Sequence, residues 1–171
     1  EGFVENSIIR QTVCKYINQF QIQSIVEFGC GLGKTTNFIY ENTGINILGV
    51  DISETSIKKS KITYPKLKFQ VNDIDNIYKY KDYESYFFSE ITWYILEDNK
   101  IDNVFELMKN SLKGKYFIQN LSFNNSQQKY GQDYFSTIDQ FIKFCPFKLL
   151  HKTSIKFEES DENETCTIFE I

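Results

Sequence analysis

Alanine is absent from the 171 residues of this chain, and Arg10 is the only arginine. Alanine is normally among the commonest residues, whereas the abundant Ile, Lys and Asn have AT-rich codons. The bias therefore indicates a low-GC source and carries no chemistry by itself. Apolar runs near the ~18 residues of a membrane-spanning helix are also absent, so we expect no membrane segment.

Cysteine and histidine are too few and too scattered to predict a metal centre. The sequence has no Cys-x-x-Cys pair, and His151 is the only histidine. Widely spaced cysteines are typical of a reduced protein, so we expect a cytoplasmic location and no bound metal. The chain starts at Glu1 without Met and has no apolar signal core, so we expect it to begin inside a longer protein.

Positive charge is also scarce. The formal net charge is −4 and the pI is about 5.1, which argues against a nucleic-acid partner bound through bulk electrostatics. What the chain has is apolar and aromatic residues, 41% and 16% of the sequence. A chain of this length and composition can bury a substantial core, which predicts one folded domain over residues 1–171.

Short apolar runs alternate with amphipathic segments along the chain. The spacing predicts helices over residues 3–20, 34–42, 53–64, 98–112 and 136–144. Extended runs predict strands over residues 24–28, 45–50, 67–71, 84–91, 115–121, 147–157 and 165–171. This alternation predicts an α/β fold with a mostly parallel sheet, helices on both of its faces and a C-terminal antiparallel hairpin.

A glycine-rich turn, Gly29-Cys30-Gly31-Leu32-Gly33, follows the first predicted strand. A phosphate-binding loop needs glycine five residues before Gly33, where Phe28 stands. A dinucleotide-binding fingerprint beginning at Gly29 needs glycine at position 34, where Lys34 stands. Neither of these two motifs fits.

The turn instead resembles motif I of class I S-adenosylmethionine-dependent methyltransferases. Glu27 stands two residues before the first glycine, and the pattern G-x-G-x-G follows it. Asp51 ends the second predicted strand, and Asp73 follows the third. The segment Glu90–Leu96 after the fourth strand is similar to the corresponding segment of small bacterial methyltransferases found with sugar-, nodulation-factor- and capsule-modifying enzymes.

The resemblance implies a Rossmann-like, doubly wound, seven-stranded sheet. Residues 1–23 would form an N-terminal helix, 24–122 the cofactor-binding core, and 123–171 a substrate-side loop, a helix and the terminal hairpin. The cofactor would be S-adenosylmethionine (SAM), with S-adenosylhomocysteine (SAH) as product. The resemblance assigns the cofactor to Glu27, Gly29, Cys30, Gly31, Gly33, Asp51, Ile52, Asp73, Ile74, Glu90 and Trp93.

Within that site the glycine turn would hold the methionine part of SAM and Asp51 the ribose. Asp73, Ile74 and Ile52 would hold the adenine, and Glu90 with Trp93 and Tyr94 would lie near the sulfonium. Taken singly, these residues also have structural interpretations, such as Asp51 as a helix cap.

Catalytic and substrate residues are less clearly marked. Glu90, Tyr94 and His151 are the candidates for the general base, although His151 also fits a simple edge-strand histidine. Tyr130, Asp133 and Tyr134 form a loop on the ligand side of the sheet, which we assign to the substrate; a packed aromatic loop is the alternative.

The methyl acceptor is expected to be an O or N atom of a small molecule, such as a sugar, a nucleotide-linked compound or a capsule precursor. We expect neither nucleic acid nor a membrane as partner, and the sequence indicates no oligomeric state. A SAM-binding subunit without catalytic activity, or a nucleotide-binding oxidoreductase, are the alternative functions.

Overall fold

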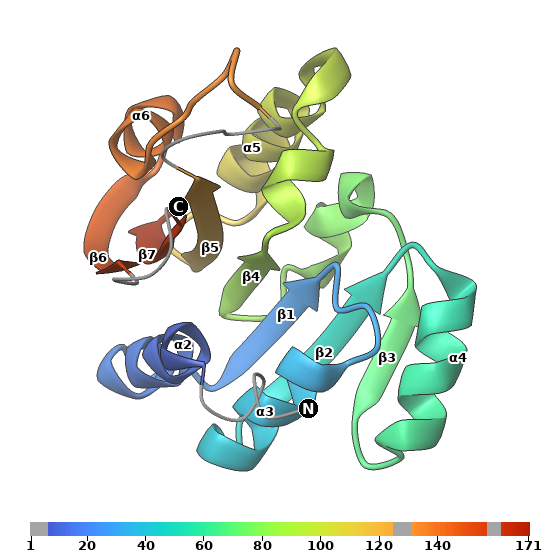
Figure 1. The fold of residues 1–171 in the computed structure, drawn as a ribbon. Coiled ribbons are helices and arrows are strands. Elements are labelled where there is room, and N and C mark those ends of the chain that lie inside the picture. The colour runs from blue at the N-terminus through green and yellow to red at the C-terminus, as the bar shows by residue number, and fades with distance from the viewer. Residues whose placement is uncertain (1–6, 125–130, 157–161) are drawn as a thin grey trace.

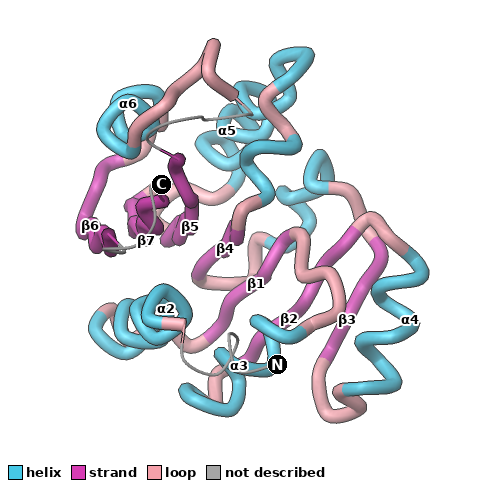
Figure 2. The backbone as a smooth tube through the Cα atoms, viewed as in Figure 1, coloured by secondary structure: helices cyan, strands magenta, loops and turns pink. Residues whose placement is uncertain are grey.

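The computed structural model describes residues 7–124, 131–156 and 162–171. They form a seven-stranded sheet with the order β3-β2-β1-β4-β5-β7-β6 (Figures 1 and 2). Strands β1 to β5 are parallel, and β7 runs antiparallel to both β5 and β6. The strands are β1 Ser24–Phe28, β2 Asn46–Asp51, β3 Lys68–Val71, β4 Ser85–Ser89, β5 Tyr116–Asn124, β6 Lys148–Lys156 and β7 Glu162–Glu170. The predicted doubly wound α/β fold with its C-terminal hairpin is confirmed.

Helices lie on both faces of this sheet (Figure 1). The α-helices are α2 Ile8–Gln19, α3 Lys34–Thr43, α4 Glu54–Thr63, α5 Lys100–Ser111 and α6 Ile138–Phe144. Short 3-10 helices are η1 Ile74–Tyr80, η2 Ile91–Tyr94 and η3 Glu97–Asn99. Within the described residues, no helix is long and apolar enough to cross a bilayer.

Alternating strand residues build a separate apolar core on each face. On one face Ile25 and Ile118 pack with α2 and α3. On the other face Val26 and Phe117 pack with η1, α5 and α6. A third, smaller cluster joins Ile57 of α4 to Phe69 of β3. Burial on both faces explains why the strands read as nearly continuous apolar runs in the sequence.

Several predicted boundaries are wrong by a few residues. The fourth strand ends at Ser89 rather than at residue 91, because Glu90 adopts φ +61 and the chain turns into η2. Strand β5 runs to Asn124 rather than to residue 121, because β7 pairs with it as far as Asn124↔Glu162. The 3-10 helices were not predicted, because such short segments show no sustained hydrophobic periodicity in the sequence.

The parallel strands β1 to β4 all end at the same edge of the sheet. In open α/β sheets, ligands bind outside the carboxyl ends of the strands. Strands β1 and β4 are neighbours in the sheet although β2 and β3 lie between them in the chain. The strand order therefore reverses beside β1, which places a binding crevice there.

Candidate functional site: a pocket at the carboxyl edge of the sheet

The glycine turn links β1 to α3 in a conformation that needs its glycines. Gly29 has φ +73, and a Cβ on it would overlap the Cγ2 atom of Ile91. Gly33 has φ +75 and caps α3, and a Cβ there would lie 2.6 Å from the Phe69 ring. Since a side chain fits at neither position, the turn brings backbone close to η2 and to β3.

Asp51 ties this turn to the end of β2. Its Oδ2 accepts a hydrogen bond from the Gly31 amide, and its Oδ1 accepts one from the Ser53 amide, both at 2.8 Å. The residue that caps α4 is Ser53, whose side chain accepts from the Ser56 amide. The helix-cap interpretation of Asp51 is therefore wrong, and its carboxylate is held at the strand edge instead.

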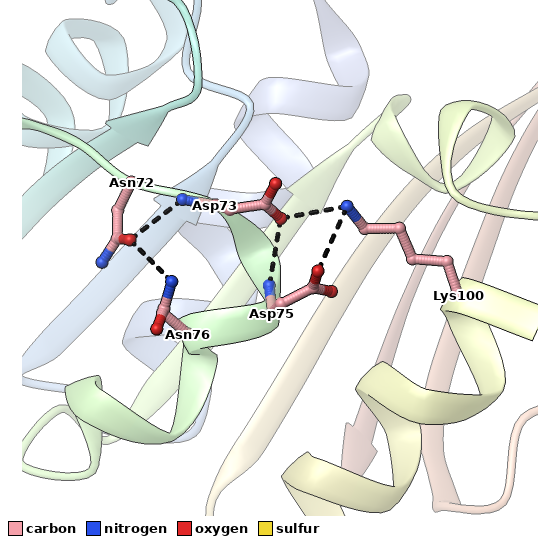
Figure 3. Close-up of polar contacts among 5 residues, drawn as sticks. All are labelled: Asn72, Asp73, Asp75, Asn76 and Lys100. Carbon is pink, nitrogen blue, oxygen red and sulfur yellow. Dashed lines mark hydrogen bonds and ion pairs between the residues drawn. The ribbon is translucent and has the colours of Figure 1, made fainter.

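Asp73 lies at the end of β3, where an ion pair holds it (Figure 3). Its Oδ1 accepts from Lys100 Nζ at 3.0 Å and from the Asp75 amide at 3.2 Å. Burial raises the pKa of Asp73, but the Asp75 hydrogen bond and the Lys100 ammonium outweigh burial and leave the pKa below its ordinary value. The carboxyl group thus stays ionised and accepts hydrogen bonds.

A pocket of about 370 Å³ connects these residues. Its volume lies in the usual range of small-molecule sites. Six of the predicted site residues line it: Gly29, Asp51, Ile52, Asp73, Ile74 and Tyr94. The other lining residues, which sequence reasoning missed, are Phe28, Val50, Asn72, Ile91, Ile95 and Lys100.

The acceptor groups and walls of this pocket fit a purine nucleoside. The Asp51 carboxylate accepts hydrogen bonds, as needed for a pair of ribose hydroxyls. Asp73 offers a second, ionised acceptor for an exocyclic amine. Apolar side chains of Ile52, Ile74 and Ile95 supply flat contact for a base. The residues present therefore fit the nucleoside part of SAM.

Glu90 and Trp93 meet in a polar corner next to the pocket wall at Ile91. Glu90 Oε2 accepts from Trp93 Nε1 at 3.0 Å, and Oε1 accepts from Ser122 Oγ at 2.8 Å. Burial raises the pKa of Glu90 above its ordinary value, although the hydrogen bonds from Ser122 and Trp93 oppose this, and the nearby Glu164 adds to it. The predicted proximity of Glu90 and Trp93 is found, but neither side chain lines the pocket.

Some predicted cofactor residues face the protein interior. Glu27 is 1% exposed and accepts from Thr36 Oγ1 at 2.5 Å. Cys30 packs with Ile57 and Phe69 beneath α4. Neither side chain lines the pocket. Glu27 instead joins β1 to α3, and Cys30 joins the glycine turn to α4 and β3. Gly31 and Gly33 likewise shape the turn without lining the pocket.

The structure does not bring His151 to the site. His151 lies on β6, where its Nε2 is 3.1 Å from Gln19 Nε2 and its ring packs near Tyr16 and Phe20. These three residues belong to α2 or directly follow it, on the face opposite η1 and α5. The structure therefore places His151 outside the pocket lining, where the edge-strand interpretation fits.

The predicted substrate loop is only partly described. Tyr130 lies outside the described residues. Asp133 is exposed, Tyr134 is 40% exposed, and neither lines the pocket. The following Phe135 packs against Trp93 at a ring distance of 5.3 Å. A role of this loop in substrate binding stays a prediction.

Comparisons with known proteins agree with this geometry. A family model described as a methyltransferase domain matches residues 25–115, just over half of the chain. The chain belongs to the methyltransferase-domain family. A putative methyltransferase, 235L of Invertebrate iridescent virus 6, is 33% identical over 105 residues. That match spans 57% of this chain and 39% of the length of the viral protein.

Solved methyltransferase structures share the fold. The methyltransferase domain of bacterial CtHen1-CN superposes with a TM-score of 0.75 at 14% identity, covering 95% of this chain and 97% of that one. The N-methyltransferase NodS of Bradyrhizobium japonicum WM9 gives 0.73 at 11%, covering 97% and 98%. A SAM-dependent methyltransferase of Clostridium acetobutylicum gives 0.69 at 12%, covering 95% and 90%. The domain therefore has the class I SAM-dependent methyltransferase fold.

Proposed function

We propose that the chain is a SAM-dependent methyltransferase that transfers a methyl group to an O or N atom of a small molecule. The observation that carries the proposal is the order of groups along one pocket. Gly29 after β1, Asp51 at the end of β2 and Asp73 after β3 line the same 370 Å³ space beside the crevice. Family membership over residues 25–115 supports SAM as the methyl donor.

The lining residues divide the binding of SAM between them. Asp51 accepts hydrogen bonds from the ribose, and Asp73 and Ile74 hold the adenine. The Gly29 turn approaches the methionine part. SAM supplies an electrophilic methyl group next to a sulfonium. The protein aligns the acceptor with that group, excludes water and takes up the proton that a hydroxyl or amine acceptor loses.

Glu90 is our candidate for the residue that takes up this proton. It follows β4 directly, and the next residue, Ile91, lines the pocket. Burial raises its pKa above the ordinary value, which makes the carboxylate a better proton acceptor. Trp93 and Ser122 donate to its two oxygens and fix its orientation. The aromatic rings of Trp93 and Tyr94 also suit a neighbouring cation.

The acceptor is proposed to be small and rich in hydroxyl or amino groups. Glu164 on β7 stands opposite Ser122 on β5, so a second carboxylate lies close to Glu90. Carboxylates accept hydrogen bonds from O–H and N–H groups. A sugar, a nucleotide-linked compound or a capsule precursor meets this requirement. The structural likeness to an N-methyltransferase supports an N atom as one possible methyl acceptor.

Binding of SAH tests the cofactor assignment directly. We expect SAH to raise the melting temperature of the protein, as a ligand of the folded state must, and NAD to leave it unchanged. Asp51→Ala should remove the shift. Glu54→Ala, which removes an exposed carboxylate from α4, is the matched control and should keep the shift. Stabilisation by NAD and not by SAH would refute the proposal.

A screen with labelled methyl donor tests the acceptor class. We expect label to appear on a member of a panel of sugars, amino sugars and nucleotide sugars, and none on DNA or RNA. If SAH binds but no panel member is labelled, the small-molecule part of the proposal is refuted. A SAM-binding subunit without catalytic activity then becomes the better interpretation.

A further inference from the structure

Lys100 lines the pocket although it belongs to none of the sequence motifs described above. It is the first residue of α5, and its ammonium reaches across to the turn after β3 (Figure 3). Nζ lies 3.0 Å from Asp73 Oδ1 and 3.5 Å from Asp75 Oδ2. The Lys100 side chain is 34% exposed and lines the same pocket as Asp73. One cation therefore joins α5 to the nucleoside end of the site.

The local sequence does not favour a lysine in this place. A positive side chain at the start of a helix is repelled by the helix dipole. The two preceding residues, Asp98 and Asn99, have φ values of 55° and 57°. Asp and Asn tolerate this left-handed region better than other non-glycine residues, but two such residues in succession are uncommon. Two unfavourable local features, a cation at a helix start and a left-handed backbone before it, therefore accompany the contact between Lys100 and Asp73.

Stability alone does not account for these costs. Ion pairs between partly exposed side chains contribute little to folding, and the Asp73 and Lys100 side chains are each about one-third exposed. Departures from local sequence rules of this kind concentrate at functional sites. A role in binding accounts for the arrangement better than a role in folding.

Hydrogen bonds in the turn around Asp73 hold its backbone and its side chain separately, and the Lys100 ion pair acts on the side chain. Asn72 Oδ1 accepts from the Asp73 amide and from Asn76 Nδ2, both at 3.0 Å, and fixes the backbone. The side chain is fixed separately, because Lys100 and the Asp75 amide both donate to Oδ1. Both of these donors contact Oδ1, so neither Lys100 nor the Asp75 amide occupies Oδ2.

We propose that Lys100 is a positioning residue that holds the Asp73 carboxylate for a base with an exocyclic amine. The inference rests on the proposed function, because that function gives the pocket an adenine ligand. An acceptor fixed at this place favours the amino group of adenine. It disfavours the carbonyl oxygen that hypoxanthine carries at the same position, since two acceptors then face each other.

Titration calorimetry with two ligands tests the proposal without any turnover. SAH carries adenine, and S-inosylhomocysteine carries hypoxanthine in its place. We expect Lys100→Met to weaken SAH binding about tenfold, the size typical of a lost charged hydrogen bond, and to leave the weak binding of the inosyl ligand nearly unchanged. Lys100→Arg should keep most of the wild-type preference for SAH.

Lys109→Met is the matched control. Lys109 lies on the same helix, but its Nζ pairs with Glu106 at 3.7 Å and its side chain is 62% exposed. We expect this variant to bind both ligands as the wild type does. An effect of lysine removal on α5 as such would appear in both variants, and an effect on Asp73 only in Lys100→Met.

Each outcome separates the two proposals. If the wild type binds SAH and Lys100→Met binds it equally well or more tightly, the positioning role is refuted and the proposed function stands. If Lys100→Met loses both ligands equally, the residue is structural and the positioning role is again refuted. If the wild type does not bind SAH at all, the proposed function fails and this inference fails with it.

Discussion

Replacing Glu27 with glutamine should change how the stability of the protein depends on pH. Glu27 is 1% exposed at the end of β1 and accepts a hydrogen bond from Thr36. Burial raises the pKa of its carboxyl from 4.5 to about 7; the Thr36 hydrogen bond and Arg10 oppose the rise, and Asp51 adds to it. Glutamine keeps the size and the hydrogen-bonding oxygen of this side chain but does not ionise.

The size of the effect follows from the two pKa values. One pKa unit corresponds to about 1.4 kcal/mol, so ionising Glu27 costs about 3 kcal/mol more in the folded chain than in the unfolded chain. Because the folded pKa is the higher one, the folded state binds the proton more tightly. The stabilisation from this proton is complete below pH 4.5 and is lost as the pH rises to about 7.

Urea unfolding of wild type and Glu27→Gln between about pH 4 and pH 8 measures this contribution. We expect the free energy of unfolding of the variant, relative to wild type, to increase by about 3 kcal/mol across the range. The other titrating groups are common to both proteins and cancel. Glu106→Gln, at a side chain that is 63% exposed, is the control and should run parallel to wild type. Parallel curves for Glu27→Gln would refute the reasoning.

Two further predictions concern the pocket wall at Gly29 and the neighbouring carboxyl group of Glu90. Gly29→Ala should lower the free energy of unfolding by about 1–3 kcal/mol, since its Cβ overlaps Ile91 and its φ is +73; thermal unfolding measures this, and an unchanged melting temperature would contradict it. Glu90→Gln should lower kcat about a hundredfold or more, measured with the acceptor found by the screen. Its KM for SAM should stay within about twofold of the wild-type value. An unchanged kcat would exclude Glu90 as the proton acceptor.

Residues that stand at strand ends and turns were predictable, because strand ends and turns carry local sequence signals. Gly29, Asp51 and Asp73 each follow a recognisable strand, and all three line the pocket. The order of the elements then fixes their meeting at one edge of the sheet. The same logic found the proximity of Glu90 to Trp93, since the two are three residues apart.

Residues brought in by tertiary packing were not predictable in the same way. Lys100 reaches Asp73 across 27 residues, and its position depends on how α5 packs against η1. Glu27 matches a functional motif by residue type. In the structure, however, its buried side chain hydrogen-bonds to Thr36 and does not line the pocket. His151 was a plausible base by chemistry alone, and the register of β6 with β7 places it against α2.

The pKa values of Asp73 and Glu90, near the two ends of the site, are shifted in opposite directions, and this difference supports different roles. At Asp73, the Asp75 amide and the Lys100 ammonium outweigh burial and lower the pKa, so this carboxylate stays charged and can only accept hydrogen bonds. At Glu90, burial outweighs the Ser122 and Trp93 hydrogen bonds and raises the pKa. Carboxyl groups whose pKa values are driven apart by their surroundings mark a division between binding and proton transfer. Asp73 therefore suits recognition of the cofactor base, and Glu90 suits the proton released by the acceptor.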